Sequence, residues 1–265
     1  MQMSKIKFSV VIPTCDRPAL LKETLKSVFS QSLSPSEVII VDNGINQIGA
    51  EVFKRDKKIK YIRALPRIGV AQARNIGICS ASGDYLAFLD DDDLWDENYL
   101  REVARVIDTT NISVVLGGVK ALETGRAILP WSQPIKSLEY FKDQLLRTNP
   151  GVVGSNTVIK RDLVIKFHGF DPFLTTGEDR ALVLDLLLKH NTRVVRAEKA
   201  LTYYRTDNKS GRLTDRGTLL RGKTRFLFKY WKIMDFSTRF QVLLKLLKLG
   251  IKNIIGVDYI IKRDE

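Results

Sequence analysis

The chain has 265 residues, of which 44% are hydrophobic and 28% are charged. This composition is typical of a soluble globular protein, and the length is sufficient to bury a large core. No run reaches the about 18 uncharged apolar residues that a membrane-spanning helix needs, and the first residues show no signal-peptide pattern. With two cysteines and two histidines, neither a disulfide framework nor a structural zinc site is expected, and we expect a cytoplasmic protein.

The net charge of +13 is unevenly distributed along the chain. Residues 209–265 hold 14 of the 43 Lys and Arg residues but only 5 of the 30 Asp and Glu residues. The basic character therefore belongs mainly to a C-terminal tail. This favours an anionic partner of the tail over a nucleic-acid-binding body.

The first half of the chain alternates short apolar strands with amphipathic helices. Strands are predicted at residues 8–13, 37–41, 60–62 and 85–89. Helices are predicted at about 18–29, 69–81 and 98–108. Asp16 is the expected cap of the first helix, with Pro18 near its start. Such alternation predicts an α/β fold with a parallel sheet and right-handed crossovers.

The pattern loosens from about residue 117. Residues 125–150 are rich in loop formers, so we expect a lid or a wall of a binding site there. A strand near 157–159 and a helix near 180–189 follow. After residue 210, two basic amphipathic helices are predicted. Their apolar faces hold Phe226, Leu227, Tyr230 and Trp231 in the first, and Phe240, Leu243, Leu244, Leu247 and Ile254 in the second.

The strand predicted at residues 85–89 ends in four consecutive carboxylates, Asp90, Asp91, Asp92 and Asp93. Two like charges about 4 Å apart repel by roughly 4 kcal/mol at an effective dielectric near 20, so such a cluster is usually offset by a cation. Oxygen ligands at the carboxyl end of a strand suit Mg²⁺ or Mn²⁺. The alternative is a charged loop that opens the next helix, which fits Asp93, Asp96 and Glu97. For Asp90 to Asp92 the sequence favours a metal site.

Four motifs occur in order along this pattern. They are residues 9–18 (SVVIPTCDRP), 38–44 (VIIVDNG), 69–77 (GVAQARNIG) and the acidic run that begins at Asp90. A fifth motif, Gly177-Glu178-Asp179, heads an apolar helix. Over about residues 8–210 the chain thereby resembles glycosyltransferase family 2, the inverting GT-A enzymes that use nucleotide-sugar donors.

The resemblance implies a fold and a division of the chain. The GT-A fold is a Rossmann-like, mixed but mainly parallel sheet flanked by helices. Residues 1–210 would form the catalytic domain, with a nucleotide-binding half at about 1–116 and an acceptor half at about 117–210. Residues 211–265 would form a basic amphipathic helical tail.

The resemblance also implies a donor site between the ends of the first two strands. The donor-binding residues would be Pro13, Thr14, Cys15, Asp16, Asp42, Asn43, Arg74, Asp90, Asp91 and Arg205. Asp42 or Asn43 would accept the N3–H of uracil or thymine. Asn43 departs from the family, which more often has an acid there, and Cys15 stands where the family often has an aromatic side chain. The alternative for residues 42–44 is a plain turn after a strand.

Two arginines have implied roles on the donor side. Arg74 lies in a helix of small residues and would contact acidic or phosphate groups; a solvated surface arginine is the alternative. Arg205 would bind phosphate, and a structural salt bridge is the alternative.

The metal and the base follow from the same resemblance. Asp92 would be the direct ligand of Mn²⁺ or Mg²⁺ together with Asp90, and Asp90 and Asp91 would reach ribose or metal-bound water. The cation would bridge the donor diphosphate and neutralise the leaving group. Asp179 would accept the proton of the acceptor hydroxyl in a single displacement, with Glu178 as the alternate base. First-turn helix acids are the alternative for Glu178 and Asp179.

These features together predict a metal-dependent inverting glycosyltransferase. It would move a sugar from a UDP- or dTDP-sugar to a glycan or lipid-linked acceptor in polysaccharide, lipopolysaccharide or capsule assembly. The alternatives are a sugar nucleotidyltransferase, which would need a glycine-rich phosphate loop after the first strand, and a nucleotide-sugar-binding protein without catalysis. Nucleic-acid binding is disfavoured because the best-defined site is acidic.

The basic tail at 211–265 has two interpretations. Amphipathic basic helices lie in the interface of anionic membranes, which would place the protein peripherally on the inner face of the cell membrane. Alternatively, the apolar faces pack on the catalytic domain and the basic faces are solvated.

Overall fold

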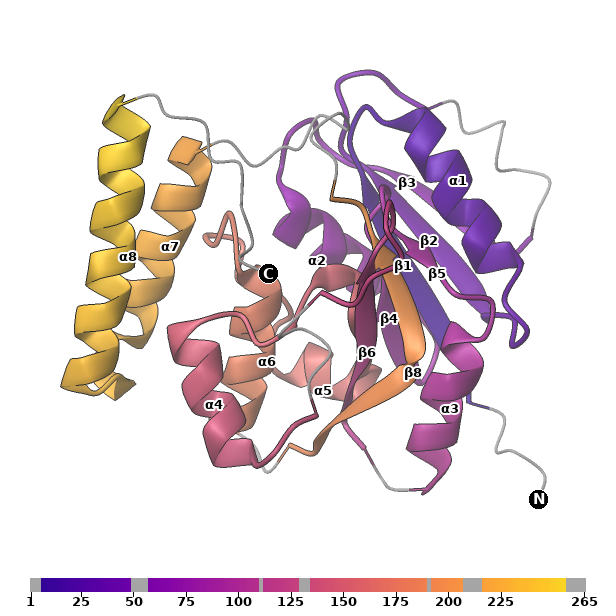
Figure 1. Ribbon diagram of the computed structural model, residues 1–265. Coiled ribbons are helices and arrows are strands. Elements are labelled where there is room, and N and C mark those ends of the chain that lie inside the picture. Colours follow the sequence, from indigo (N-terminus) through magenta and orange to yellow (C-terminus); the bar gives the residue numbers. More distant parts are fainter. Residues whose placement is uncertain are drawn as a thin grey trace.

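The computed structural model describes residues 6–48, 57–109, 112–128, 134–189, 192–206 and 216–255. These residues form an eight-stranded sheet with helices on both faces (Figure 1). The strands are β1 (Phe8–Thr14), β2 (Glu37–Asp42), β3 (Ile59–Arg63), β4 (Tyr85–Phe88), β5 (Leu94–Trp95), β6 (Val114–Ala121), β7 (Thr157–Lys160) and β8 (Val194–Tyr204). The helices are α1 (Pro18–Phe29), α2 (Val70–Ser80), α3 (Tyr99–Thr109), α4 (Leu138–Arg147), α5 (Arg161–Lys166), α6 (Glu178–Lys189), α7 (Arg216–Tyr230) and α8 (Phe236–Ile255), with short 3₁₀ turns η2 (Gly154–Asn156) and η4 (Trp231–Ile233).

The strand order is β3-β2-β1-β4-β7-β6-β8-β5. The first four strands in this order are parallel, β7 runs antiparallel to both its neighbours, and β5 is an antiparallel edge strand. Thr14 at the end of β1 lies opposite Asp42 at the end of β2, and Val11 lies opposite Phe88 of β4. The carboxyl ends of these strands therefore share one edge, and the predicted mixed, mainly parallel sheet is confirmed.

Every strand and helix predicted before residue 110 is present, with ends within two residues of the expected ones. Three strands were not predicted: β5, β6 and β8. β6 contains Gly117 and Gly118, and β8 is interrupted by Glu198 and Lys199, which hides the apolar pattern. In the stretch expected to be loop, α4 forms because the Ser137 hydroxyl caps its first turn.

α1 begins without the expected Asp16 cap. Its N-cap residue is Arg17, whose side chain makes no capping bond. Asp16 has a φ of 58°, and its carboxylate accepts hydrogen bonds from the Asn46 N–H at 2.9 Å and from Arg67 at 2.9 Å. The Asn46 N–H lowers the pKa of Asp16 by stabilising its charged form. Asp16 thus joins the loop after β1 to the loop after β2.

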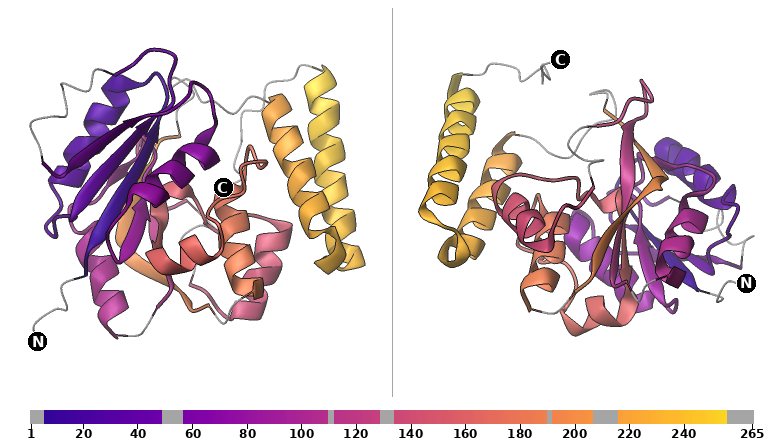
Figure 2. Two further views of the ribbon diagram at one scale, coloured as in Figure 1. Left: turned by 180° about the vertical axis from the view of Figure 1, so that it is seen from behind. Right: turned by 60° about the horizontal axis from the view of Figure 1, so that its bottom comes forward.

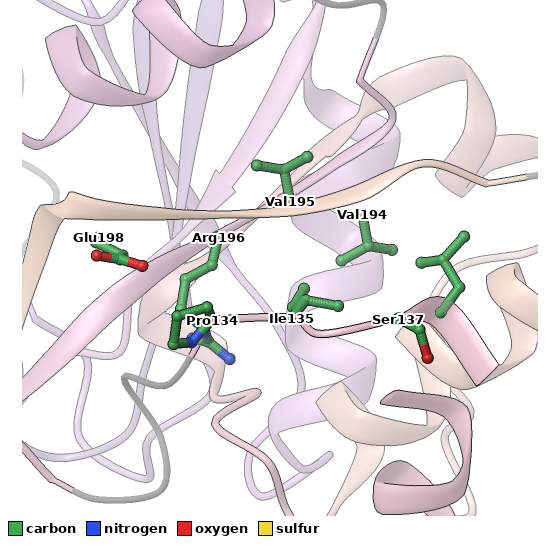
Figure 3. Close-up of a pocket in the computed structure, with 8 residues that line it drawn as sticks. Pro134, Ile135, Ser137, Val194, Val195, Arg196 and Glu198 are labelled. Carbon is green, nitrogen blue, oxygen red and sulfur yellow. The ribbon is translucent and has the colours of Figure 1, made fainter. Parts of the chain in front are cut away.

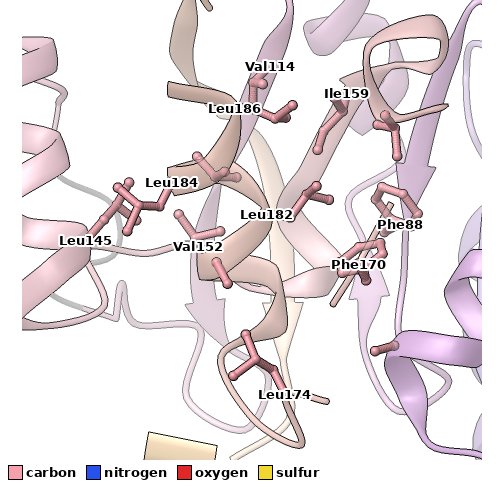
Figure 4. Packing of buried hydrophobic residues seen from close by; sticks show 14 of the residues in the cluster. Phe88, Val114, Leu145, Val152, Ile159, Phe170, Leu174, Leu182, Leu184 and Leu186 are labelled. Carbon is pink, nitrogen blue, oxygen red and sulfur yellow. The ribbon is translucent and has the colours of Figure 1, made fainter. Parts of the chain in front are cut away.

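The core has one layer on each face of the sheet. α1 and α3 cover one face with side chains such as Leu21, Val28 and Leu100. α2, α4, α5 and α6 cover the other face, where the apolar side of α6 packs against Phe88 and Ile159 (Figure 4). Both faces of the central strands are buried, as a sheet of this kind requires.

The two C-terminal helices form a pair at one side of the molecule, with α8 outermost (Figure 2). Phe226, Leu227 and Tyr230 of α7 are buried in the core that α6 also fills. The Tyr230 hydroxyl donates to Ala181 O at 3.1 Å, and Asp185 Oδ1 lies 3.0 Å from it. Of the two interpretations of the basic tail, packing of the apolar face on the rest of the protein is therefore the correct one for α7. The expected domain boundary at 210–211 lies outside the described residues.

The packing of α6 can be tested with two leucines of the same helix. Leu186 is fully buried and Leu188 is 45% exposed. Leu186→Ala is expected to lower the free energy of unfolding by about 3 kcal/mol, because it leaves a cavity against the sheet. Leu188→Ala should change it by less than about 0.5 kcal/mol. Urea unfolding followed by circular dichroism measures both, and equal losses would contradict the assignment of the buried face.

Candidate active site

The acidic run after β4 separates into outward and inward carboxylates. The side chains of Asp90 and Asp92 are 27% and 17% exposed, whereas Asp91 and Asp93 are buried. The alternation points every second carboxylate toward the solvent at the carboxyl edge of the sheet. The two outward side chains are those that the sequence assigned to a metal.

Arg17 neutralises the inner part of the run. Its guanidinium pairs with both oxygens of Asp91, and its Nη1 lies 2.6 Å from Asp92 Oδ2. The Thr14 hydroxyl donates to Asp91 Oδ2 at 2.7 Å. Burial raises the pKa of Asp91 to about 7, although Arg17 and Thr14 favour its charged form. The sequence alone did not identify Arg17 as a site residue. Its position between β1 and Pro18, at the carboxyl edge of the sheet, could have indicated a partner for the acidic run.

Asp93 and Arg205 anchor the acidic loop to the rest of the sheet. Asp93 Oδ2 accepts from Ser155 Oγ at 2.5 Å, and Asp93 Oδ1 accepts from the Arg205 N–H at 2.9 Å. The Arg205 guanidinium donates to Asp92 O at 3.0 Å and pairs with Glu23 at 2.9 Å. Burial raises the pKa of Asp93 well above its usual range. Asp93 is therefore a buried anchor, not a first-turn acid of α3, and Arg205 makes the structural salt bridge that was its alternative.

The end of β2 presents one engaged and one available polar side chain. Asp42 is fully buried, and its oxygens accept hydrogen bonds from Tyr61 Oη at 2.6 Å and from the Gly44 N–H at 2.9 Å. Arg63 Nη1 lies 2.9 Å from Asp42 Oδ1 as an ion pair. Asn43 is nearly buried, and its side-chain amide makes no hydrogen bond to the part of the chain that the structure describes. Of the two residues, Asn43 has the free capacity to accept an N–H.

Pro13 and Cys15 flank the same strand ends. Pro13 lies in β1 opposite Val41. Cys15 is buried, and its Sγ lies 3.6 Å from Asn43 O, so the thiol donates to the backbone that carries the Asn43 amide. Burial raises the pKa of Cys15, which keeps it a neutral thiol.

Arg74 connects the acidic loop to α6. It is buried in α2, with Nη2 at 2.5 Å from Asp90 Oδ1 and Nη1 at 2.7 Å from Glu178 Oε1. The Arg74 guanidinium also lies over the aromatic ring of Phe170, with its Cζ atom 5.2 Å from the ring centroid. Burial alone would lower the pKa of Arg74, but Asp90 and Glu178 hold it above its usual value. The solvated alternative for Arg74 is therefore wrong, because a buried guanidinium here bridges two carboxylates.

Asp179 lies in the first turn of α6, directly after Glu178. Its Oδ1 accepts the Arg180 N–H at 2.6 Å, and the side chain is half-buried. Burial, together with the charge of Glu178, raises the pKa of Asp179 to about 7, although Arg74 opposes the shift. A carboxylate with this pKa is a stronger base than an ordinary aspartate.

Gly154 makes the approach of Arg74 possible. A Cβ built on Gly154 would lie 2.8 Å from the Arg74 guanidinium carbon and 3.2 Å from Asp90 Oδ1. Only a residue without a side chain leaves this space free. Sequence reasoning missed Gly154, because nothing in its neighbours distinguishes it from other loop glycines.

A cavity of about 330 Å³ lies elsewhere in the fold, between β8 and the segment before α4 (Figure 3). Its lining includes Ile135, Val194 and Arg196 and none of the residues of the acidic edge. Arg196 donates to the Pro150 carbonyl at 2.9 Å, and burial lowers the pKa of Arg196 to about 10. The cavity is therefore separate from the candidate active site.

Most elements of this site lie in a segment that matches a known protein family. The model of the family described as Glycosyl transferase family 2 matches residues 9–167, which include β1, the acidic loop and Gly154. The chain belongs to glycosyltransferase family 2. It is accordingly a glycosyltransferase.

Two relatives illustrate the membership in family 2. An uncharacterized glycosyltransferase of Haemophilus influenzae is 28% identical over 196 residues, which cover 74% of this chain and 67% of that protein. A protein of Escherichia coli named UDP-Glc:alpha-D-GlcNAc-diphosphoundecaprenol beta-1,3-glucosyltransferase is 26% identical over 251 residues, which cover 92% of this chain and 93% of that protein. By contrast, the chain spans only 31%, 16% and 31% of three related Rickettsia glycosyltransferases.

A solved structure shows the same fold. The crystal structure of residues 1–349 of S. aureus TarS in complex with UDP-GlcNAc aligns with a TM-score of 0.68 at 20% identity, covering 93% of this chain and 73% of that one. The GT-A fold predicted for this family 2 chain is therefore confirmed.

The role of Gly154 can be tested by a single methyl group. Gly154→Ala is expected to displace the Arg74 guanidinium and to lower the free energy of unfolding by about 1–3 kcal/mol through overpacking. Gly250→Ala in α8 is the matched control, because its Cβ would meet nothing within 4 Å; that change should stabilise by about 0.5–1 kcal/mol. Thermal unfolding measures both, and an unchanged Gly154→Ala protein would contradict the tight approach.

Proposed function

We propose that this family 2 glycosyltransferase transfers a sugar, with inversion, from a UDP- or dTDP-sugar to a glycan or lipid-linked acceptor, with Mn²⁺ or Mg²⁺. The observation that carries the proposal is the buried Arg74 bridge. It joins Asp90, on the donor side, to Glu178, which directly precedes the candidate base Asp179. A donor site and a base on two different elements are thereby held in one fixed relation.

The donor side is supported by the free polar groups at the strand ends. The Asn43 amide oxygen would accept the base N3–H, while Asp42 is occupied in supporting the loop that carries it. Asp16 and Cys15 would line the same crevice. The S. aureus neighbour was solved with UDP-GlcNAc, which supports a uridine nucleotide in a site of this fold.

The divalent cation is supported by the outward carboxylates. Among the described residues no group of three or more His, Cys, Asp or Glu side chains is arranged to hold a metal. Two carboxylates are nevertheless a fitting protein contribution, because Mg²⁺ is usually held by one or two carboxylates, substrate phosphates and water. Asp90 and Asp92 would hold the ion. When bound, it would neutralise charge on the departing diphosphate.

The chemistry of the transfer rests on Asp179. The acceptor oxygen bonds to the anomeric carbon while the bond from that carbon to the diphosphate oxygen breaks, so the configuration inverts. The hydroxyl proton becomes acidic as this bond forms and passes to Asp179. Oδ1 of Asp179 is engaged by the Arg180 N–H, which leaves Oδ2 to take the proton. Glu178, paired with Arg74, would position Asp179 and maintain its raised pKa.

The acceptor class rests on the Escherichia coli relative, whose alignment covers nearly the whole chain. Its name specifies a glucose donor and an N-acetylglucosamine joined through diphosphate to a polyprenol. A lipid-linked glycan is therefore the acceptor class we propose, as a step in the assembly of a bacterial surface glycan.

Binding of the donor nucleotide and the cation can be measured without catalysis. UDP with Mn²⁺ is expected to raise the unfolding temperature of the full chain, corresponding to about 2.7 kcal/mol at a hundredfold excess over Kd. Asp92→Asn should remove most of this stabilisation, whereas Glu97→Gln, a nearby exposed acid, should retain it. Equal stabilisation of both variants would rule out Asp92 as the metal ligand.

The pH dependence of transfer tests the base. Asp179 must be ionised to accept a proton, and its pKa is about 7; kcat/KM should therefore fall about tenfold per pH unit below that value. Glu178→Gln removes a neighbouring negative charge, so the pKa of Asp179 falls and the acidic limb moves to lower pH. If the acidic limb of the Glu178→Gln profile stays at the same pH, Glu178 does not raise the pKa of Asp179.

The identity of the base is tested in the same assay. Asp179→Asn should reduce transfer at least about a hundredfold while retaining the stabilisation by UDP and Mn²⁺. Asp162→Asn, an exposed acid in the first turn of α5, is the matched control and should transfer normally. Full activity of Asp179→Asn would exclude it as the base.

A further inference from the structure

The outer side of α8 is a continuous apolar surface. Six large side chains on it are exposed at spacings of 4, 7, 8, 11 and 15 residues from the first, which places them on one face of a helix. They are Phe236, Phe240, Leu243, Leu244, Leu247 and Ile251. We name this set the outer face of α8. It extends over about 23 Å at the rise of an α-helix.

The outer face is not needed to attach α8 to the protein. Val242 and Leu246, on the opposite side of the helix, pack against the core that contains α7. Thr238 is buried on the same side, and Lys245 Nζ donates to Arg147 O at 3.1 Å. Exposed apolar surface of this size is uncommon unless it is used for interaction. The inner side therefore anchors the helix while the outer face stays open.

The segment that carries this face is strongly basic. Residues 216–255 include ten Lys and Arg residues and a single acid, Asp235. That acid is already engaged by the Thr238 N–H at 2.7 Å and by Arg147 at 3.4 Å. Lys248 adjoins the outer face, and Arg221 and Lys232 are exposed on the neighbouring elements.

We propose that the outer face of α8 docks on the surface of an anionic lipid bilayer, with α8 lying parallel to the membrane plane. The apolar side chains would enter the boundary between headgroups and acyl chains, and the lysines would meet the lipid phosphates. No helix of the described chain is both long enough and apolar enough to cross a bilayer, which fits a surface-bound arrangement.

A second copy of the chain fits this face less well. Two outer faces packed together would bring the lysines beside them close to one another, and like charges repel at such distances. An anionic surface instead complements them. The proposal deepens the proposed function, because a docked enzyme would meet a lipid-linked acceptor in two dimensions, but docking itself requires neither donor nor acceptor.

The test is co-sedimentation of the full chain with vesicles, without donor, acceptor or metal. We expect binding to vesicles of mixed phosphatidylglycerol and phosphatidylcholine, weak binding to pure phosphatidylcholine, and release by about 0.5 M NaCl. Phe240→Asp with Leu247→Asp, at side chains 55% and 60% exposed, should weaken binding at least about tenfold. Lys232→Glu with Lys248→Glu, two exposed lysines, should weaken it by a similar factor on anionic vesicles only.

Matched controls lie on α1, on the opposite side of the molecule (Figures 1 and 2). Phe29→Asp replaces a phenylalanine that is 43% exposed, and Lys22→Glu with Lys26→Glu replaces two exposed lysines. Both should bind vesicles like the original chain. Unchanged circular dichroism and an unchanged unfolding temperature without ligand would show that every variant is folded. Because no nucleotide is present, the result is independent of the proposed function.

Three outcomes would overturn the proposal. One is absence of the chain from the anionic vesicle pellet. Another is equal binding by the α8 and α1 variants. The third is a dimer in light scattering that the Phe240→Asp, Leu247→Asp protein loses while vesicles have no effect, which would assign the outer face to a second copy of the chain.

Discussion

The ion pairs of buried Arg74 are the constraint on which the candidate active site depends. A guanidinium removed from water is stable only when charged partners surround it. Asp90 and Glu178 supply them, from the loop after β4 and from the start of α6. Three elements far apart in the sequence are thus held together, and Gly154 provides the space in which they meet. The relation between the donor side and the base is a consequence of this one packing requirement.

The acidic loop follows the same logic. Four adjacent carboxylates cannot all face one cation, and the fold divides them. Arg17 and Thr14 hold Asp91 inside, while Ser155 and the Arg205 backbone hold Asp93. The inner pair thereby fixes the loop. The outer pair reaches the solvent, although Asp90 also pairs with Arg74 and Asp92 with Arg17. Part of the repulsion that suggested a metal in the sequence is offset by the protein's own arginine.

The C-terminal helices show how similar sequences can take different roles. Both are basic and amphipathic, yet α7 buries Phe226 and Tyr230 against α6, whereas α8 leaves a whole apolar side in contact with solvent. The difference arises from the available surface. α7 packs against the side of α6 that faces away from the sheet. α8 is the outer helix of the pair, so only one of its sides packs against protein.

The sequence by itself determined the alternation of β1 to β4 with α1 to α3, since apolar runs and helical periodicity are local properties. It also located the acidic run from Asp90 after a strand and Asp179 at the start of a helix, because both positions follow from the local pattern. Only the tertiary structure decided that Arg74 is buried, that Arg17 pairs with Asp91 and that Asp42 is fully engaged. These depend on contacts between residues up to 104 positions apart, as in the Arg74–Glu178 pair. Local pattern carries no information about such distant partners, which only the packing of the sheet brings together.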